Sequence, residues 1–219
     1  NFIMNSGSSD SHEAVFRPSS GTDCVIASNN VTVTRGIVKL NTVSHNASMG
    51  NLTIGSTGTF QASSGTTTIK SRSSGGYSWY APTTNSTFTH NNGTVKFTLE
   101  DWGGASETFV QGTGFYNVEF AANSSAMEFR YDDLTDNSGL TVLNNFTISE
   151  GRFRFNTGGD SVTVHGLTKM SGGQYGNTGT APSGTHNYLG GITMLGGAWQ
   201  TTSGTLNTSG LRILGGTFA

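Results

Sequence analysis

NFTISEGRFRFNTGGDSVTVHG, residues 145–166, contains three short segments in which apolar side chains alternate with polar ones, separated by glycine. The segments are FTI, FRF and VTV. In an extended strand such a triplet places its first and third side chains on one side and its middle side chain on the other. A strand this short buries too little apolar surface to be stable alone, so neighbouring copies must complete it.

The same layout occurs in NLTIGSTGTFQASSGTTTIKSR, residues 51–72, which has the same length and contains LTI, TFQ and TTI. Further copies follow along the chain at steps of 19 to 36 residues, and the longer steps resemble the same unit with loop insertions. The first segments of the copies begin at Val31, Leu52, Phe88, Val118, Phe146, Leu167, Ile192 and Leu211. Self-similarity at a fixed period is typical of solenoid proteins.

Three strands and three turns in about 22 residues describe one coil of a single-stranded parallel β-helix. Each strand would stack on its counterpart one turn later, and the apolar positions would merge into one continuous core. The sequence therefore predicts an all-β solenoid of about seven coils of three short strands, with a right-handed coil. Thr fills the middle position of six of the eight first segments, which predicts outward-facing threonine.

An antiparallel sandwich is the rival fold, because it also consists of many short strands. A sandwich does not explain why three such segments recur in the same order within units of about 22 residues. The repeat is expected over residues 22–219 and to continue beyond Ala219, because LRILGGTFA ends inside a new coil. Residues 1–21 are rich in serine and lack the repeat, so they are expected to form a leader, cap or linker.

Composition narrows the classes of function. The net charge of -2 gives no reason to expect binding to nucleic acid or to an anionic membrane, and no apolar run has the length of a membrane span. Cys24 is the single cysteine, so a fold held together by intrachain disulfides is excluded. We expect Cys24 to be buried and to pack as a small apolar side chain.

The units STFTHNNGTVKFT (residues 86–98), FYNVEF (115–120) and LNNFTISEGRFRF (143–155) resemble β-solenoid repeats of bacteriophage tail fibres, tailspikes and bacterial surface adhesins. The resemblance is one of repeat style and covers about residues 24–219. It implies a rod on the virion surface, outside the cell or on the cell surface. It also implies a homo-oligomer, such as a trimer, or contact with further coils of the same chain.

Residues able to support chemistry are sparse. Glycoside hydrolysis needs two carboxylates across a groove, and the register places Glu119 and Glu128 on neighbouring outer faces of one coil. Asp132, Asp133 and Asp136 form a weak candidate for Ca²⁺, although no known calcium-loop spacing is present. We therefore expect no enzyme activity, no cofactor and no resident metal.

The insertion SRSSGGYSWYAPTTN, residues 71–85, extends one coil and contains several aromatic residues. If exposed, these rings could stack on sugars or contact another subunit; alternatively, the loop folds back and buries them on the flank of the coil. A second insertion, EDWGGASE, supplies a further tryptophan. The candidate contacts to a host surface glycan or subunit are Arg72, Tyr77, Trp79, Tyr80 and Trp102.

Four functions remain open after these observations. The first is a structural rod that spaces or presents a receptor-binding part, and the second is a carbohydrate-binding adhesin module that uses the aromatic insertions. The third is a polysaccharide-degrading β-helix enzyme whose groove lies elsewhere in a longer chain. The fourth, an ice-binding solenoid, needs regular ranks of T-x-T, and the ranks here are irregular.

Overall fold

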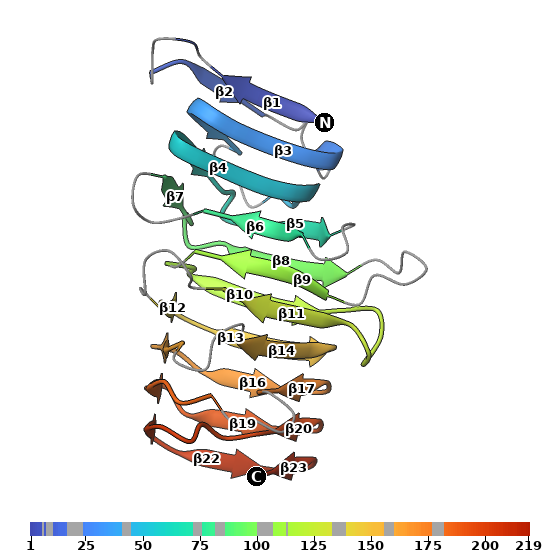
Figure 1. The fold of residues 1–219 in the computed structure, drawn as a ribbon, viewed down its shortest axis with the longest axis vertical. Helices are drawn as coiled ribbons and strands as arrows, with labels where there is room; N and C mark the ends of the chain where they lie inside the picture. The colour runs from blue at the N-terminus through green and yellow to red at the C-terminus, as the bar shows by residue number, and fades with distance from the viewer. Residues whose placement is uncertain are drawn as a thin grey trace.

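The chain folds as an all-β solenoid of stacked parallel strands in a computed structural model (Figure 1). The N- and C-termini lie at opposite ends of the stack. No helix is present among the described residues, and hence none that is long and apolar enough to cross a membrane. The structure describes residues 1–5, 7, 11–16, 24–40, 45–71, 76–81, 86–99, 107–112, 114–132, 139–155, 160–176 and 182–219.

The strands lie on three faces, which we number in the order the chain visits them within a turn. Face 1 contains β5 (Thr66–Ser71), β8 (Thr94–Leu99), β10 (Asn117–Ala121), β13 (Phe146–Glu150), β16 (Thr168–Met170), β19 (Ile192–Met194) and β22 (Leu211–Ile213). Face 2 contains β1 (Phe2–Asn5), β6 (Tyr77–Tyr80), β9 (Glu107–Gln111), β11 (Glu128–Tyr131), β14 (Arg152–Phe155), β17 (Gln174–Tyr175), β20 (Ala198–Trp199) and β23 (Thr217–Phe218). Face 3 contains β2 (Glu13–Val15), β7 (Thr87–Thr89), β12 (Leu140–Val142), β15 (Val162–Val164), β18 (His186–Tyr188) and β21 (Leu206–Thr208).

Two long strands lie between β2 and β5 in the chain and bend around all three faces. They are β3 (Cys24–Lys39) and β4 (Ala47–Gln61), and β4 pairs in turn with β5, β6 and β7. From β5 to β21 the chain makes about six turns of three strands, with Phe115 bridging to Val142 in place of a third strand in one of them. The predicted fold class is thus confirmed, and the coil count differs slightly from the expected seven.

Register is kept from turn to turn in the second half of the molecule. On face 1 Phe146 pairs with Thr168, Thr168 with Ile192, and Ile192 with Leu211. On face 3 Val142 pairs with Val164 and Val164 with Tyr188. Each short strand therefore gains two parallel neighbours, which supply the backbone hydrogen bonds that it cannot make alone.

The interior is a continuous column of apolar and aromatic side chains. The rings of Phe97 and Phe120 stack with centroids 5.1 Å apart, and those of Tyr175 and Trp199 with centroids 3.9 Å apart. Successive turns thus place rings over rings along the axis, and each buried aromatic side chain contributes a large apolar area to the core. The outward positions alternate with these buried ones, as in the pattern of β14, where Phe153 and Phe155 are buried.

Glycine makes the corner between faces 1 and 2 possible. Gly151, Gly173, Gly197 and Gly216 occupy equivalent corners in successive turns, and all have positive φ. A Cβ added to Gly173 would lie 2.3 Å from the carbonyl oxygen of Gly151 one turn above. A side chain is therefore excluded both by the left-handed backbone and by the close approach of the neighbouring turn.

The first segments of the copies were predicted to stack on one another on a single face, and for the copies nearest the N-terminus this is wrong. Val31 and Leu52 lie on face 2, where Leu52 pairs with Trp79, and Phe88 lies on face 3, whereas Val118 and Phe146 lie on face 1. Residues 51–72 and 145–166 thus share a three-segment layout but begin it on different faces. All three faces use the same alternating triplet, so the pattern within one segment does not say which face it occupies.

The copy expected to begin at Leu167 is shifted by one residue. Thr168 pairs with Phe146 and is fully buried, Met170 is also buried, and Lys169 is exposed. Leu167, expected in the core, is 42% exposed at the corner before the strand. Register with the turns above and below decides this orientation, and it outweighs the preference of leucine over threonine for the interior.

The N-terminal segment takes part in the stack. Strand β1 pairs in parallel with β3 on face 2, and β2 pairs with it on face 3. The described part of residues 1–21 thus continues the ladder, and the expectation that this segment is a leader, cap or linker stays a prediction. The side chain of Cys24, at the start of β3, lies outside the described residues, and continuation of the repeat beyond Ala219 remains a prediction.

Candidate functional site

The candidate residues that the structure describes gather on the outer side of face 2. Alternation along β6, β11 and β14 turns one set of side chains into the core and the other toward the surface. We call the outward set, together with the residue that follows β11, the face 2 surface. Its members are Tyr77, Tyr80, Glu128, Arg130, Asp132, Arg152 and Arg154.

Tyr77 and Tyr80 form the aromatic part of this surface. Their ring centroids lie 5.1 Å apart at an interplanar angle of 66°, and both side chains are half-buried. The Tyr77 hydroxyl donates a hydrogen bond to Oδ2 of the buried Asp132. The pKa of Tyr77 is raised well above its ordinary value, mainly by burial and secondly by the hydrogen bond to Asp132. The phenol therefore keeps its proton and acts as a donor.

Trp79 is not part of the surface. Of the two alternatives for the rings of the aromatic insertion, exposed or buried, the buried one holds for Trp79, which is fully buried and pairs with Leu52 on one side and Val110 on the other. Its ring centroid lies 4.9 Å from that of Phe88 and 5.3 Å from that of Phe115. Alternation turns Trp79 into the core next to the outward Tyr80, and the bulge between Tyr77 and Trp79 allows Tyr77 to face outward as well.

The remaining predicted site residues lie outside the part of the chain that the structure describes. Arg72 and Trp102 belong to this group, as do Asp133 and Asp136 of the weak calcium candidate. Asp132 itself is buried and bonded to Tyr77. Within the described ranges, no group of three or more His, Cys, Asp or Glu side chains is placed to hold a metal ion.

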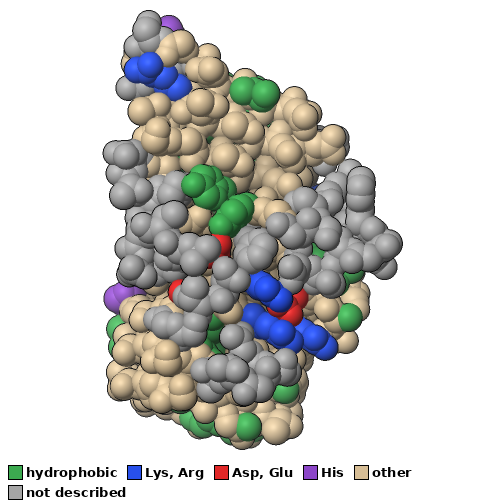
Figure 2. Space-filling view, in the orientation of Figure 1, with side chains coloured by type: hydrophobic (Ala, Val, Ile, Leu, Met, Phe, Trp, Pro, Cys, Tyr) green, Lys and Arg blue, Asp and Glu red, His purple; other side chains and the backbone are tan. Residues whose placement is uncertain are grey.

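A charged cluster occupies β11 and β14 on the same surface. Glu128 pairs with Arg152 in backbone register, and Arg130 pairs with Arg154. The Glu128 carboxylate, which is buried, lies 2.5 Å from Nε of Arg130 and 3.0 Å from Nε of Arg154. Figure 2 shows the basic side chains gathered around an acidic one at the height of these two strands. The cluster therefore joins two successive turns through one carboxylate.

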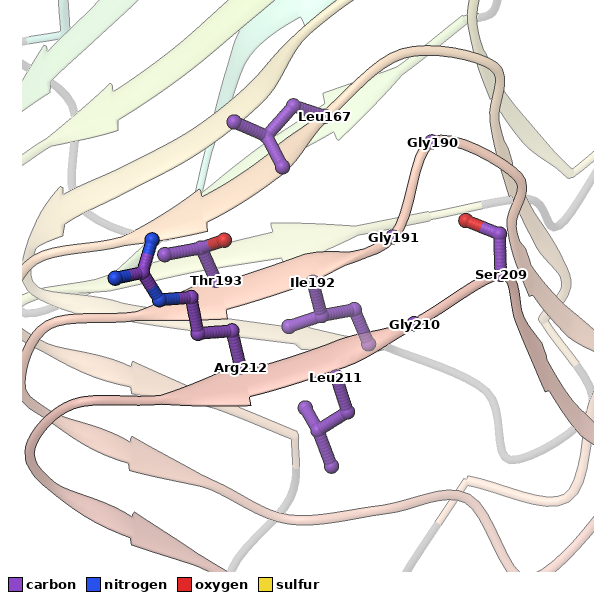
Figure 3. Close-up of a pocket in the computed structure, with 9 residues that line it drawn as sticks. All are labelled: Leu167, Gly190, Gly191, Ile192, Thr193, Ser209, Gly210, Leu211 and Arg212. Carbon is purple, nitrogen blue, oxygen red and sulfur yellow. The ribbon is translucent and has the colours of Figure 1, made fainter.

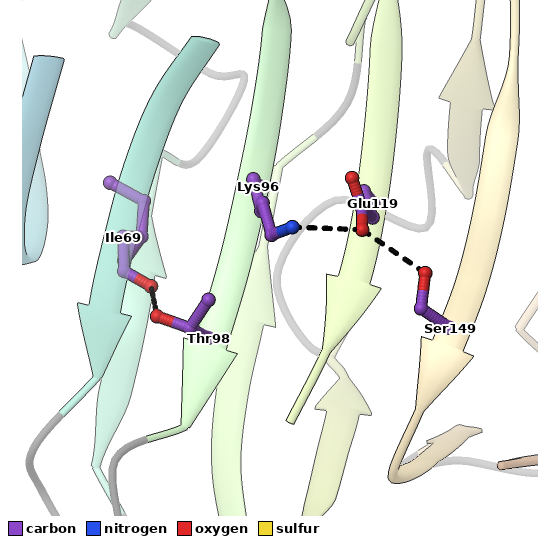
Figure 4. A network of polar contacts seen from close by, with 5 residues as sticks. All are labelled: Ile69, Lys96, Thr98, Glu119 and Ser149. Atoms are coloured by element: carbon purple, nitrogen blue, oxygen red, sulfur yellow. Dashed lines mark hydrogen bonds and ion pairs between the residues drawn. The ribbon is translucent and has the colours of Figure 1, made fainter. Parts of the chain in front are cut away.

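Glu119 lies on face 1, apart from this cluster. Its carboxylate lies 3.0 Å from Nζ of Lys96 on β8 and accepts a hydrogen bond of 3.0 Å from the Ser149 hydroxyl on β13 (Figure 4). A shallow hollow of about 240 Å³ lies beside it. The acidic charge of Glu119 is thus balanced locally by Lys96.

The carboxylates predicted as a candidate pair, Glu119 and Glu128, do not have the arrangement that glycoside hydrolysis uses. Glu119 and Glu128 point outward from different faces, as expected, and so do not flank a common groove. Glu128 and Asp132 share face 2, but they are four positions apart along an extended strand, which places their Cα atoms about 13 Å apart. Catalytic pairs lie about 5 to 9.5 Å apart. The expectation that the chain is not an enzyme stays a prediction.

A second hollow, of about 290 Å³, lies at the corner between faces 3 and 1 near the last turns. Figure 3 shows glycine backbone along one side of it and the side chains of Thr193 and Arg212, from the paired strands β19 and β22, along the other. Arg212 is its single charged side chain. It offers fewer groups for recognition than the face 2 surface does.

The three arginines of the cluster were not predicted as site residues. The sequence signal was present in EFRY and GRFRF, where outward charged residues alternate with inward aromatic ones. Glu128 and Arg152 are 24 residues apart in sequence, so their proximity appears only once the turns are placed in register. A search restricted to carboxylates does not find a site made mainly of arginine.

Comparison with known proteins gave no match to a family model, to a curated protein or to a solved structure.

Proposed function

We propose that this chain is a structural β-helical rod in an extracellular or virion appendage, where it spaces or presents a receptor-binding part. The observation that carries the proposal is the parallel ladder that runs unbroken along face 2 from β1 to β23, beside one apolar column. Such a stack resists bending because every interior turn is bonded to the turns above and below it. A rod needs this continuity, whereas an enzyme or a receptor needs only a local site.

The location is proposed from the resemblance of the repeat units to those of phage tail fibres, tailspikes and surface adhesins. The same resemblance supports a homo-oligomer, such as a trimer, or contact with further coils of the same chain. The virion surface, the extracellular space and the cell surface all suit a rod of this kind.

A second candidate function is a carbohydrate-binding adhesin module. The specific observation in its favour is the half-buried pair Tyr77 and Tyr80 on the face 2 surface. Tyrosine combines an apolar ring with a polar hydroxyl, which suits contact with sugars or with another protein. This version of the hypothesis no longer includes Trp79, because its ring is buried.

Immunogold electron microscopy tests the rod proposal. Antibodies raised against the purified chain are applied to intact particles and cells of the source, and to sections of broken cells. We expect gold along an external appendage, and pre-incubation of the antibody with purified chain as the control should remove it. Label confined to the cell interior would overturn the proposal.

A further inference from the structure

We propose that Tyr175 is a redox-active tyrosine, which gives up one electron through Trp199 to a one-electron oxidant in solution and its phenol proton to His186. This inference goes beyond the rod proposal, because a rod needs no redox-active group. Tyr175, on β17, and His186, on β18, lie in one turn of the solenoid, and both side chains are buried in its core. A proton that leaves this phenol therefore goes to a group of the protein rather than to water.

The polar groups of this turn are not required for stacking. The turn above fills the positions of Tyr175 and His186 with Phe153 and Val162, and the turn below has Leu206 under His186. Apolar side chains are thus sufficient for the core at these positions. Burying a phenol and an imidazole costs free energy that hydrogen bonds must offset. Packing alone therefore does not explain why the two groups occur side by side.

His186 is placed to accept the proton. Its Nδ1 atom lies 3.0 Å from the Tyr175 hydroxyl, and its Nε2 atom lies 3.3 Å from the backbone oxygen of Asp160. Burial lowers the pKa of His186 to about 4, with the bond to Asp160 acting in the opposite direction, so the imidazole is neutral near pH 7. With its proton on Nε2, where it donates to Asp160, the ring has a lone pair on Nδ1 that faces the phenol.

Tyr188 fixes the direction of the proton transfer. Its buried hydroxyl donates to the Tyr175 oxygen, so the Tyr175 hydroxyl is left to donate to His186. The pKa of Tyr175 is raised well above its ordinary value, mainly by burial and secondly by Tyr188. The phenol therefore keeps its proton until an electron leaves, and the oxygen of the radical that forms still accepts from Tyr188.

Trp199 provides the path for the electron. Its ring stacks on that of Tyr175 with centroids 3.9 Å apart and an interplanar angle of 12°. Rings in such contact exchange an electron readily, and the oxidant need not enter the core. In the complete step the oxidant gains one electron, Tyr175 becomes a neutral phenoxyl radical, and His186 becomes an imidazolium that still donates from Nε2 to Asp160. Reduction by one electron returns the proton to the phenol.

Flash photolysis of the purified chain tests this inference, with photochemically generated tris-bipyridine ruthenium(III) as the oxidant. We expect a long-lived neutral tyrosyl radical, seen by transient absorption and electron paramagnetic resonance, that forms more slowly in deuterated water because a proton moves in the same step. Tyr175→Phe should abolish the long-lived signal. His186→Gln should slow formation of the radical by about a hundredfold, because glutamine cannot take up the proton.

Tyr131→Phe is the matched control, because it removes another buried tyrosine and should leave the long-lived radical unchanged. An unchanged radical in Tyr175→Phe, or an unchanged rate in His186→Gln, would overturn the inference. Should Tyr175→Phe fail to fold, the wild-type chain still decides the matter, since the lack of a long-lived radical or of the isotope effect contradicts the proposal. None of these results bears on the immunogold test of the rod.

Discussion

Among single residues, His186 is the most unusual, because a histidine occupies a core position of the solenoid. It is 1% exposed, and its Nδ1 lies 3.0 Å from the Tyr175 hydroxyl. Tyr188 donates to Tyr175, and His186 Nε2 lies 3.3 Å from the backbone oxygen of Asp160. A neutral imidazole satisfies this chain of bonds, with Nδ1 accepting from Tyr175 and Nε2 donating to Asp160.

The first prediction concerns pH. Burial lowers the pKa of His186 to about 4, with the bond to Asp160 acting in the opposite direction. Between pH 6.5 and 4 the unfolded chain then binds a proton that the folded protein does not. The free energy of unfolding should therefore fall by about 3 kcal/mol as the pH is lowered through this window, and level off below it.

Urea denaturation at a series of pH values measures this effect. His186→Gln should remove most of that part of the pH dependence, whatever its effect on stability at pH 7. The exposed His165→Gln serves as the control and should keep the wild-type slope. If His186→Gln and wild type lose stability in parallel, the buried imidazole is not the group responsible.

A second prediction concerns the buried hydroxyl of Thr168. Its Oγ1 has no hydrogen-bond partner among the described residues, and the side chain lies between Phe146 and Ile192 in the core. Valine has the same shape without the unpaired hydroxyl, so Thr168→Val should raise the free energy of unfolding by about 1 kcal/mol. Chemical denaturation checks this, with the outward-facing Thr147→Val as a control expected to change stability by less than about 0.5 kcal/mol. A loss of stability in Thr168→Val would contradict the prediction.

At the level of the strand and its corner, the third prediction concerns Gly173. Its φ of 71° and the approach of the Gly151 carbonyl exclude a side chain, so Gly173→Ala should lower the free energy of unfolding by about 2 kcal/mol or more. Gly210→Ala is the matched control, because no heavy atom lies within 4 Å of the Cβ it would add. Similar melting temperatures for the two variants would show that the corner accepts a Cβ.

Strands were predicted well and their faces poorly. The alternation in FTI, FRF and VTV was enough to predict β13, β14 and β15 and the parallel stacking between turns. It was not enough to place Leu52 or Phe88, because faces 1, 2 and 3 impose the same requirement on a triplet. Only the contacts between turns distinguish the faces, and these are absent from a local reading of the sequence.

Alternation within a strand also decides which residues of the candidate site could be predicted from the sequence. Glu119 and Glu128 were predicted to face outward because they are middle residues of triplets, and the structure agrees. The sequence could not decide whether Trp79 is exposed or buried, because the bulge between Tyr77 and Trp79 shifts the alternation within β6. The arginine cluster was missed because it depends on register between residues in successive turns rather than on a local motif.

For the whole molecule, the repeat implies that one turn can be removed without disturbing the rest. Thr168 and Ile192 occupy equivalent positions in neighbouring turns, so deleting residues 168–191 joins Leu167 to Ile192 in register. Phe146 would then pair with Ile192, and Met194 would take the place of Met170. The shortened chain should fold cooperatively, with a long dimension smaller by about 4.8 Å.

Small-angle scattering measures the length, and circular dichroism measures the cooperativity of unfolding. The control deletes residues 168–179, about half a turn, which would join a face 1 corner to a face 3 segment and leave strands without partners. We expect this variant to unfold at a lower temperature or to aggregate, because exposed strand edges pair with other chains. If the half-turn deletion is as stable as the full-turn deletion, stability does not come from stacking in register, and the rod proposal loses its physical basis.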